Sequence, residues 1–183
     1  MKLMFASDIH GSLYWAGKMK AAWEREAPEK LILLGDLLYH GPRNDLPRDY
    51  DPKGVIALLS DLKREILCVR GNCEAEVDQM VLPFPVMADY MALWLEGRMA
   101  FATHGHLYTE EKLPMPREGD LLIHGHTHVP AARSHPAEGY TYLNPGSVSL
   151  PKEGSPNSYM VWENRRFSIR KLESGEEFLS FAL

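Results

Sequence analysis

The chain has 183 residues and a formal net charge of −5, from 20 basic and 25 acidic residues with no basic run, so its composition does not indicate a nucleic-acid-binding surface. Its hydrophobic content of 45% is ordinary for a soluble globular protein, and no stretch approaches the roughly 18 apolar residues of a transmembrane helix. Two cysteines, Cys68 and Cys73, are too few for a disulfide framework, and we expect one cytoplasmic domain over residues 1–183.

The chain begins with an apolar segment, residues 3–7, that ends in Asp8-Ile9-His10. Because an acid stands where a signal peptide would continue its apolar core, this segment predicts a buried strand. Apolar residues at helical spacing follow over residues 13–26, with Ser12 as the expected N-cap. Asp8 and His10 would then lie at the end of a strand, where a plain polar turn is the alternative to a functional role.

The same arrangement occurs twice more. Residues 30–34 are apolar and lead into Gly35-Asp36. After an amphipathic segment at 55–63, residues 65–70 predict a third strand, which leads into Gly71-Asn72-Cys73-Glu74. Parallel strands joined by helices bring their carboxyl ends to one edge of a sheet, and open α/β sheets bind ligands at that edge. The first half therefore predicts a βαβαβ unit with a polar edge.

The second half has a different pattern. Residues 87–103 alternate as in a β-hairpin and end in His104-Gly105-His106. Residues 140–147 are typical of a strand and a turn, and residues 158–172 of a second hairpin, whereas residues 173–183 fit either a strand or a surface segment. We therefore expect a mostly antiparallel second half, and two sheets packed face to face with helices outside.

Three histidines lie close together in the stretch His124-Gly125-His126-Thr127-His128, directly after the apolar run at 120–123. In an extended strand their side chains would all point the same way. A lone histidine at a strand end is more often structural than a ligand. Whether these histidines bind a metal depends on partners elsewhere in the chain.

Seven oxygen and nitrogen donors follow predicted strands, and they are the candidate metal ligands: Asp8, His10, Asp36, Asn72, His104, His126 and His128. Seven donors that share one carboxylate suit two divalent ions about 3.5–4 Å apart, which is a site for phosphoryl transfer. Asp36 is the expected bridge, with a different oxygen on each metal. The mixed donor set suits manganese, our first expectation, with zinc, iron or nickel as alternatives that affinity order does not separate.

Five motifs in order resemble those of the calcineurin-like metallophosphoesterases. They are Asp8-Ile9-His10, Gly35-Asp36, Gly71-Asn72, His104 and Gly125-His126-Thr127-His128. The short length and residues 71–74 resemble the small phosphodiesterase branch of that family. The resemblance implies an α/β fold, a four-layer αββα sandwich of two packed mixed β-sheets flanked by helices. It also implies hydrolysis of a small phosphodiester by a metal-bound hydroxide at a dinuclear centre.

The resemblance also implies roles for single residues. One metal would be held by Asp8, His10, Asp36 and His128, and the other by Asp36, Asn72, His104 and His126. Asp36, Asn72 and His104 are accordingly the candidate catalytic residues. His124 matches no ligand position, so we expect a supporting or structural role for it. His106 could reach the substrate phosphate or hydrogen-bond a ligand.

Cys73 departs from the family pattern. Many relatives have a histidine directly after the Gly-Asn pair, where it contacts phosphate and can protonate the leaving group. A thiol replaces it poorly at neutral pH, and loss of a general acid typically costs about 10²–10⁴-fold in rate. We therefore expect this chain to prefer substrates with good leaving groups, and Cys73 remains a candidate substrate contact.

Other functions use the same motifs. Within the resemblance, one relative of this architecture is a trafficking-complex subunit that acts as a binding scaffold, and a phosphomonoesterase or nuclease would use the same centre. Arg43, in a proline- and glycine-rich loop at 39–54, is a candidate substrate contact, and Arg70 and Arg133 are candidate phosphate contacts, although surface arginines are more often solvated. The apolar hairpin at 87–101 fits either a homo-oligomer surface or the core.

Overall fold

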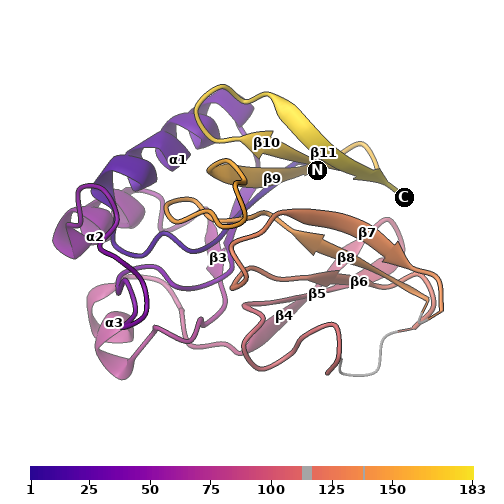
Figure 1. Ribbon diagram of the computed structural model, residues 1–183, viewed down its shortest axis with the longest axis horizontal. Helices are drawn as coiled ribbons and strands as arrows, with labels where there is room; N and C mark the ends of the chain where they lie inside the picture. Colours follow the sequence, from indigo (N-terminus) through magenta and orange to yellow (C-terminus); the bar gives the residue numbers. More distant parts are fainter. Residues whose placement is uncertain (113–116, 138) are drawn as a thin grey trace.

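The computed structural model describes residues 1–112, 117–137 and 139–183, and its two β-sheets pack face to face (Figure 1). Among these residues, six strands form the first sheet in the order β11-β10-β9-β1-β2-β3. Their bounds are β1 Leu3–Ala6, β2 Lys30–Leu33, β3 Ile66–Cys68, β9 Ser158–Glu163, β10 Arg166–Lys171 and β11 Glu177–Ala182. Five described strands form the second sheet in the order β4-β5-β6-β8-β7. Their bounds are β4 Tyr90–Leu95, β5 Arg98–Thr103, β6 Leu121–Ile123, β7 Ala131–His135 and β8 Tyr140–Asn144.

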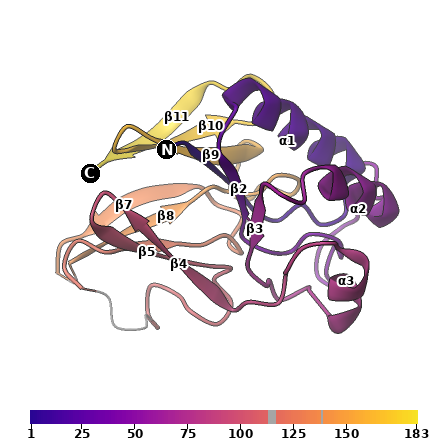
Figure 2. The ribbon, with the colours of Figure 1, turned by 180° about the vertical axis from the view of Figure 1, so that it is seen from behind.

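Helices α1 (Leu13–Glu26) and α2 (Pro52–Asp61) cover the outer face of the first sheet, as the view from behind shows (Figure 2). Helix α1 begins where expected, because the Ser12 hydroxyl accepts a hydrogen bond from the Trp15 backbone N–H. Its buried residues Ala16, Met19 and Ala22 recur at helical spacing and belong to one apolar cluster with side chains of β1 and β2. The amphipathic pattern therefore predicted both the helix and the face it buries.

A second apolar cluster fills the space between the two sheets. It includes Phe5 and Ile32 from the first sheet and Ile123 and Leu143 from the second, all fully buried. On the outer face of the second sheet, Tyr108 packs against buried Phe101 and its aromatic neighbours. The two mixed sheets confirm the predicted α/β sandwich, with its core in the places that alternation along the strands requires.

The pairing of the second half differs from the prediction. Strand β6 pairs in parallel with both β5 and β8, so the expectation of a mostly antiparallel second half is wrong for the centre of this sheet. The hairpin β9–β10 joins the first sheet, with β9 antiparallel to β1. Residues 177–182 add strand β11, which answers the question that the sequence left open.

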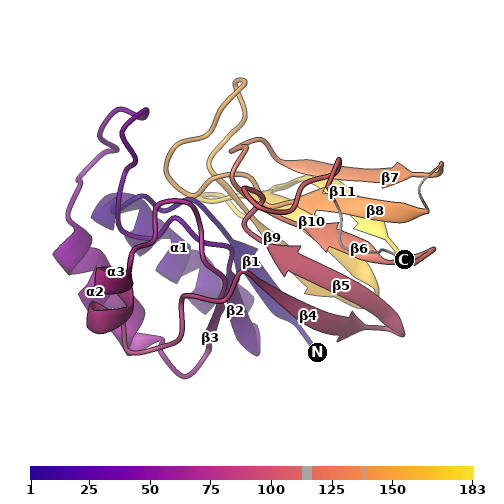
Figure 3. The ribbon, with the colours of Figure 1, turned by 90° about the horizontal axis from the view of Figure 1, so that it is seen from below.

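Two elements were not predicted. Helix α3 (Glu76–Val81) lies at the same end of the molecule as α2 (Figure 3), and strand β7 closes one edge of the second sheet. Helix α3 exposes its apolar residues Val77 and Met80, so it shows no pattern of burial. In the described parts of the chain, no helix is both long enough and apolar enough to cross a membrane.

Candidate metal centre

The candidate ligands lie in the loops that follow β1, β2 and β3 of the first sheet and β5 and β6 of the second. The strands end before these residues, and five of them have a left-handed backbone with φ between 49° and 63°: Asp8, His10, Asp36, His126 and His128. Such values are uncommon outside glycine and concentrate at functional sites. The expectation that residues 124–128 continue an extended strand with three histidines on one face is therefore wrong.

The first group of donors is formed by Asp8, His10 and His128, all of them buried. The Nε2 atoms of His10 and His128 are 3.3 Å apart. Oδ1 of Asp8 lies 3.2 Å from Nε2 of His128 and 3.7 Å from Nε2 of His10. Three atoms with lone pairs, from the loops that follow β1 and β6, therefore face one small space that could hold a cation.

The second group is formed by Asn72, His104 and His126. Nε2 of His104 lies 3.1 Å from Oδ1 of Asn72 and 3.2 Å from Nδ1 of His126. These three residues come from the loops after β3, β5 and β6, so both sheets contribute to this group. The family resemblance implied that these three residues hold one metal together with Asp36.

Asp36 lies between the two groups. Its Oδ2 is 3.6 Å from Nε2 of His10 and 3.5 Å from Nε2 of His104. Its Oδ1 accepts a hydrogen bond of 2.9 Å from the Cys73 backbone N–H. One oxygen, Oδ2, therefore faces both groups, in contrast to the expected arrangement with one oxygen for each.

The histidine rings are oriented so that their Nε2 atoms can accept a cation. Nδ1 contacts a backbone carbonyl oxygen in each of three rings: Tyr39 for His10 at 2.8 Å, Leu34 for His104 at 2.7 Å and Leu150 for His128 at 2.5 Å. Because a carbonyl oxygen only accepts, each Nδ1 donates, and in the neutral ring Nε2 then carries a lone pair. The Nε2 lone pairs of His10 and His128, 3.3 Å apart, repel one another unless a cation or proton lies between them. The donor set therefore fits divalent metal ions.

The electrostatics also favour positive charge here. Burial opposes ionisation of Asp8, but its contact with His128 and the charge of His104 hold its pKa well below the usual range. Burial likewise lowers the pKa of His104, yet the hydrogen bond to Asp36 and the charge of Asp8 raise it to about 9. Two buried carboxylates thus need compensation, which a cation can supply.

Glu74 supports this centre, although it was not among the predicted site residues. Its buried carboxylate accepts hydrogen bonds from the backbone N–H groups of Asp36 at 2.8 Å, Leu37 at 2.7 Å and Gly71 at 2.5 Å. Burial and the charge of Asp36 raise its pKa to about 7. The available signal was an acid in the turn Gly71-Asn72-Cys73-Glu74 after a predicted strand, because an acid buried there must find backbone donors.

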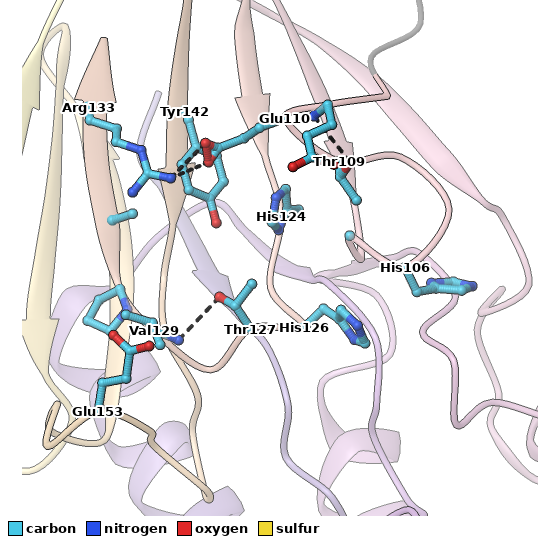
Figure 4. A pocket seen from close by; sticks show the side chains of 14 residues that line it. His106, Thr109, Glu110, His124, His126, Thr127, Val129, Arg133, Tyr142 and Glu153 are labelled. Atoms are coloured by element: carbon cyan, nitrogen blue, oxygen red, sulfur yellow. Dashed lines mark hydrogen bonds and ion pairs between the residues drawn. The ribbon is translucent and has the colours of Figure 1, made fainter. Parts of the chain in front are cut away.

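Two cavities meet at His126 and Thr127. The first, which we call the metal-side cavity, has a volume of about 680 Å³ and is lined by Asp36, Arg43 and Lys152, among others. The second, which we call the side cavity, has a volume of about 660 Å³ and opens beside His126 (Figure 4). Lys152 was not singled out from the sequence; its backbone N–H donates to the carbonyl of His128, which places it at the centre.

The remaining predicted residues lie in the metal-side cavity, in the side cavity, or outside both. Arg43 and Cys73 line the metal-side cavity, and burial together with the charge of Asp36 raises the pKa of the Cys73 thiol. His106 and His124 line the side cavity, and His124 packs on Tyr142 with ring centroids 4.6 Å apart. Burial lowers the pKa of both histidines to about 4. Arg70 pairs with Asp89 at 2.8 Å and lines neither cavity.

Comparisons with known proteins identify the family of this chain. The chain is 46% identical over 169 residues to the phosphodiesterase YfcE of Escherichia coli K12, which covers 92% of this chain and 91% of that protein. A solved structure of YfcE, a phosphoesterase from E. coli, matches with a TM-score of 0.95 at 43% identity and covers 100% of this chain and 99% of the other. Vacuolar protein sorting 29 from Cryptosporidium parvum shares the fold at a TM-score of 0.61 and 15% identity, over 100% of this chain and 98% of the other. The family model of the calcineurin-like phosphoesterase superfamily domain matches residues 1–166, a span that includes all seven candidate ligands, and the chain belongs to this superfamily.

Proposed function

We propose that this chain is a metal-dependent phosphodiesterase with a dinuclear centre. The observation that carries the proposal is the convergence of donor atoms from both sheets, with three histidine Nδ1 atoms anchored on backbone carbonyls. A relative that is 46% identical over 92% of this chain is named a phosphodiesterase, which supports the same reaction class. The proposed substrate is a small phosphodiester.

The two metal positions follow the two donor groups. Asp8, His10 and His128 would hold one ion, and Asn72, His104 and His126 would hold the other. Oδ2 of Asp36 would contact both ions, because it faces His10 and His104 at nearly equal distances of 3.6 and 3.5 Å. Manganese is our first choice of metal, with zinc, iron and nickel as the alternatives to be tested.

The side chains around the centre would bind and orient the substrate. Arg43 and Lys152 line the metal-side cavity, where their positive charges can attract phosphate oxygens. The ions, when bound, would supply Lewis-acid charge to the phosphate and lower the pKa of a water molecule. The carbonyl contacts of His10, His104 and His128 keep their rings in the ligating orientation without further rearrangement.

The leaving group would receive little help from Cys73. Its thiol lines the metal-side cavity, but burial and the carboxylate of Asp36 raise its pKa. A thiol that holds its proton this tightly is a poor general acid near neutral pH. We therefore propose that good leaving groups are preferred, as the sequence led us to expect.

A scaffold function is the alternative from another class, because vacuolar protein sorting 29 shares the fold. A scaffold does not require converging donor atoms, and here those atoms lie 3.1–3.7 Å from one another across the two sheets. That convergence favours the enzyme. Phosphomonoesterase or nuclease activity would use the same centre and differs in substrate only.

The test measures hydrolysis of paired aryl phosphomonoester and phosphodiester substrates. The protein is first chelated, and manganese, magnesium, zinc, iron or nickel is then added back. We expect activity that depends on added metal and is faster on the diester. No hydrolysis with any metal would defeat the enzyme proposal, and faster monoester hydrolysis would defeat the phosphodiesterase.

Asp36→Asn tests the bridge in the same assay. Asparagine tolerates a left-handed backbone and retains an acceptor for the Cys73 N–H, so the loop should keep its shape. We expect metal content and turnover to fall together, turnover by about 100-fold or more. Asp61→Asn, at an exposed residue of α2, is the matched control and should retain both. Full metal occupancy in Asp36→Asn would contradict the bridging role.

A further inference from the structure

The side cavity adjoins the candidate metal centre. It shares His126 and Thr127 with the metal-side cavity, so a molecule held at the centre could extend into it. Its volume of about 660 Å³ lies within the range of small-molecule sites, about 300–1,000 Å³. A phosphodiester carries two ester groups on one phosphorus. A site that binds its phosphate in one cavity has room for one ester group in the other.

The wall of the side cavity is a built surface. Tyr142, which is 3% exposed, lies between the His124 ring and the Arg133 guanidinium, whose carbon is 4.8 Å from the ring centroid. Both carboxylate oxygens of Glu110 accept hydrogen bonds from Nη2 of Arg133. Figure 4 shows Arg133, Tyr142 and His124 side by side along this wall. These packed and hydrogen-bonded groups hold one another in place, as specific ligand sites require.

The two cavities differ in charge. Glu110, Glu111 and Glu153 line the side cavity, and its one described cation, Arg133, is already paired with Glu110. Glu111 and Glu153 have no ion pair among the described residues. The metal-side cavity instead carries Arg43 and Lys152 next to the candidate metal positions. The phosphate therefore belongs to one side, and the other side repels anions and attracts cations.

We propose that the side cavity binds one ester group of the substrate and selects a positively charged amino alcohol over an uncharged group of the same shape. This inference rests on the proposed phosphodiesterase function. It also disfavours polynucleotides, because a neighbouring phosphate would face Glu111 and Glu153.

The test compares two esters that differ in one charge. The p-nitrophenyl ester of choline phosphate carries a quaternary ammonium, and its 3,3-dimethylbutyl counterpart has carbon in place of that nitrogen. We expect kcat/KM to be about fivefold higher for the choline ester, mainly through a lower KM. The effect is modest because Glu111 and Glu153 are exposed, and exposed charges interact weakly. In the double variant Glu111→Gln and Glu153→Gln the ratio should fall to about one. Glu24→Gln, on the exposed face of α1, is the matched control and should keep the wild-type ratio.

A binding measurement does not depend on turnover. Titration with choline phosphate, followed by NMR, should shift the backbone amide signals of Thr127 and Arg133, which line the side cavity. A wild-type ratio of one, a ratio unchanged in the double variant, or shifts confined to residues outside the cavity would overturn the inference. The proposed function fails differently, through absence of hydrolysis of bis(p-nitrophenyl) phosphate with every metal.

Discussion

Replacement of Glu74 should show how strongly the buried carboxylate holds the candidate metal centre. Glu74→Ala would leave three N–H groups, those of Asp36, Leu37 and Gly71, without their acceptor. An unsatisfied buried donor costs about 1–3 kcal/mol, so the free energy of unfolding should fall by at least about 3 kcal/mol. Since a domain is typically stable by only about 5–15 kcal/mol, this loss would be a large part of the protein's stability.

Glu74→Gln is therefore the more informative variant. If its amide oxygen takes the position of Oε2, it still accepts from Asp36 and Gly71, and only the Leu37 N–H loses its partner. We expect a loss of about 1–3 kcal/mol. Metal affinity should fall about 10–100-fold, because Glu74 holds the backbone of Asp36 and of the turn before Asn72.

Urea unfolding of the metal-free protein measures the first effect, and calorimetric titration with manganese or zinc measures the second. Glu24→Ala, an exposed substitution on α1, gives the baseline for loss of one surface carboxylate. The threshold is about 0.5 kcal/mol, which is half the minimum cost of one unsatisfied donor. If the free energy of unfolding of Glu74→Ala lies within that threshold of the baseline, the three hydrogen bonds do not stabilise the loops. Unchanged metal affinity in Glu74→Gln would refute the positioning role.

Three further predictions concern other residues. Cys73→His should raise turnover most for substrates with poor leaving groups, by about 10²-fold, and equal gains for all leaving groups in a rate series would refute the missing-acid argument. Gly125→Ala should destabilise the fold by about 1–3 kcal/mol and reduce metal content, because the added Cβ would lie 1.9 Å from Oγ of Ser7 and 2.7 Å from Oδ2 of Asp8. The control is Gly17→Ala in α1, where an added Cβ meets no neighbour within 4 Å. Burial opposes ionisation of Glu26, but its hydrogen bonds to Lys2 and Tyr159 and the charge of Arg170 lower its pKa. The stability that the ionised Glu26 contributes is therefore present above the unfolded-state pKa of 4.5 and is lost as pH falls through the folded-state value. Acid titration of unfolding should therefore be flatter in Glu26→Gln, and an identical pH profile would count against this linkage.

Much of the first half could be predicted from the sequence because its signals are local. The apolar runs before Asp8 and Asp36 correspond to β1 and β2, and Ser12 caps α1 as its position indicated. The parallel pairing of β6 with β5 and β8 was missed, since short apolar runs do not specify a partner that lies far along the chain. Strand β7, with the sequence Ala-Ala-Arg-Ser-His, has no alternation to reveal it.

At the candidate centre, the residue types were predictable and their conformations were not. Side-chain chemistry identified Asp36 and the histidines as candidate donors. The left-handed backbone at Asp36 and His126, which turns these side chains toward the centre, depends on contacts between loops. Glu74 was overlooked for the same reason, because its partners are backbone N–H groups that no side-chain pattern records.

The origin of the candidate ligands in both sheets has a consequence for folding. Asp8 and Asp36 follow strands of the first sheet, and His104 and His128 follow strands of the second. Ions bound there would cross-link two layers that meet mainly through apolar side chains and a few hydrogen bonds such as that of His104 to the Leu34 carbonyl. Neither ion could gain its full set of ligands before the layers dock, so tight binding would come late in folding. Once bound, the ions would slow the separation of the two sheets during unfolding. Hydrogen exchange in β1 and β6 should then report metal occupancy, although neither strand contributes a ligand from within its own bounds.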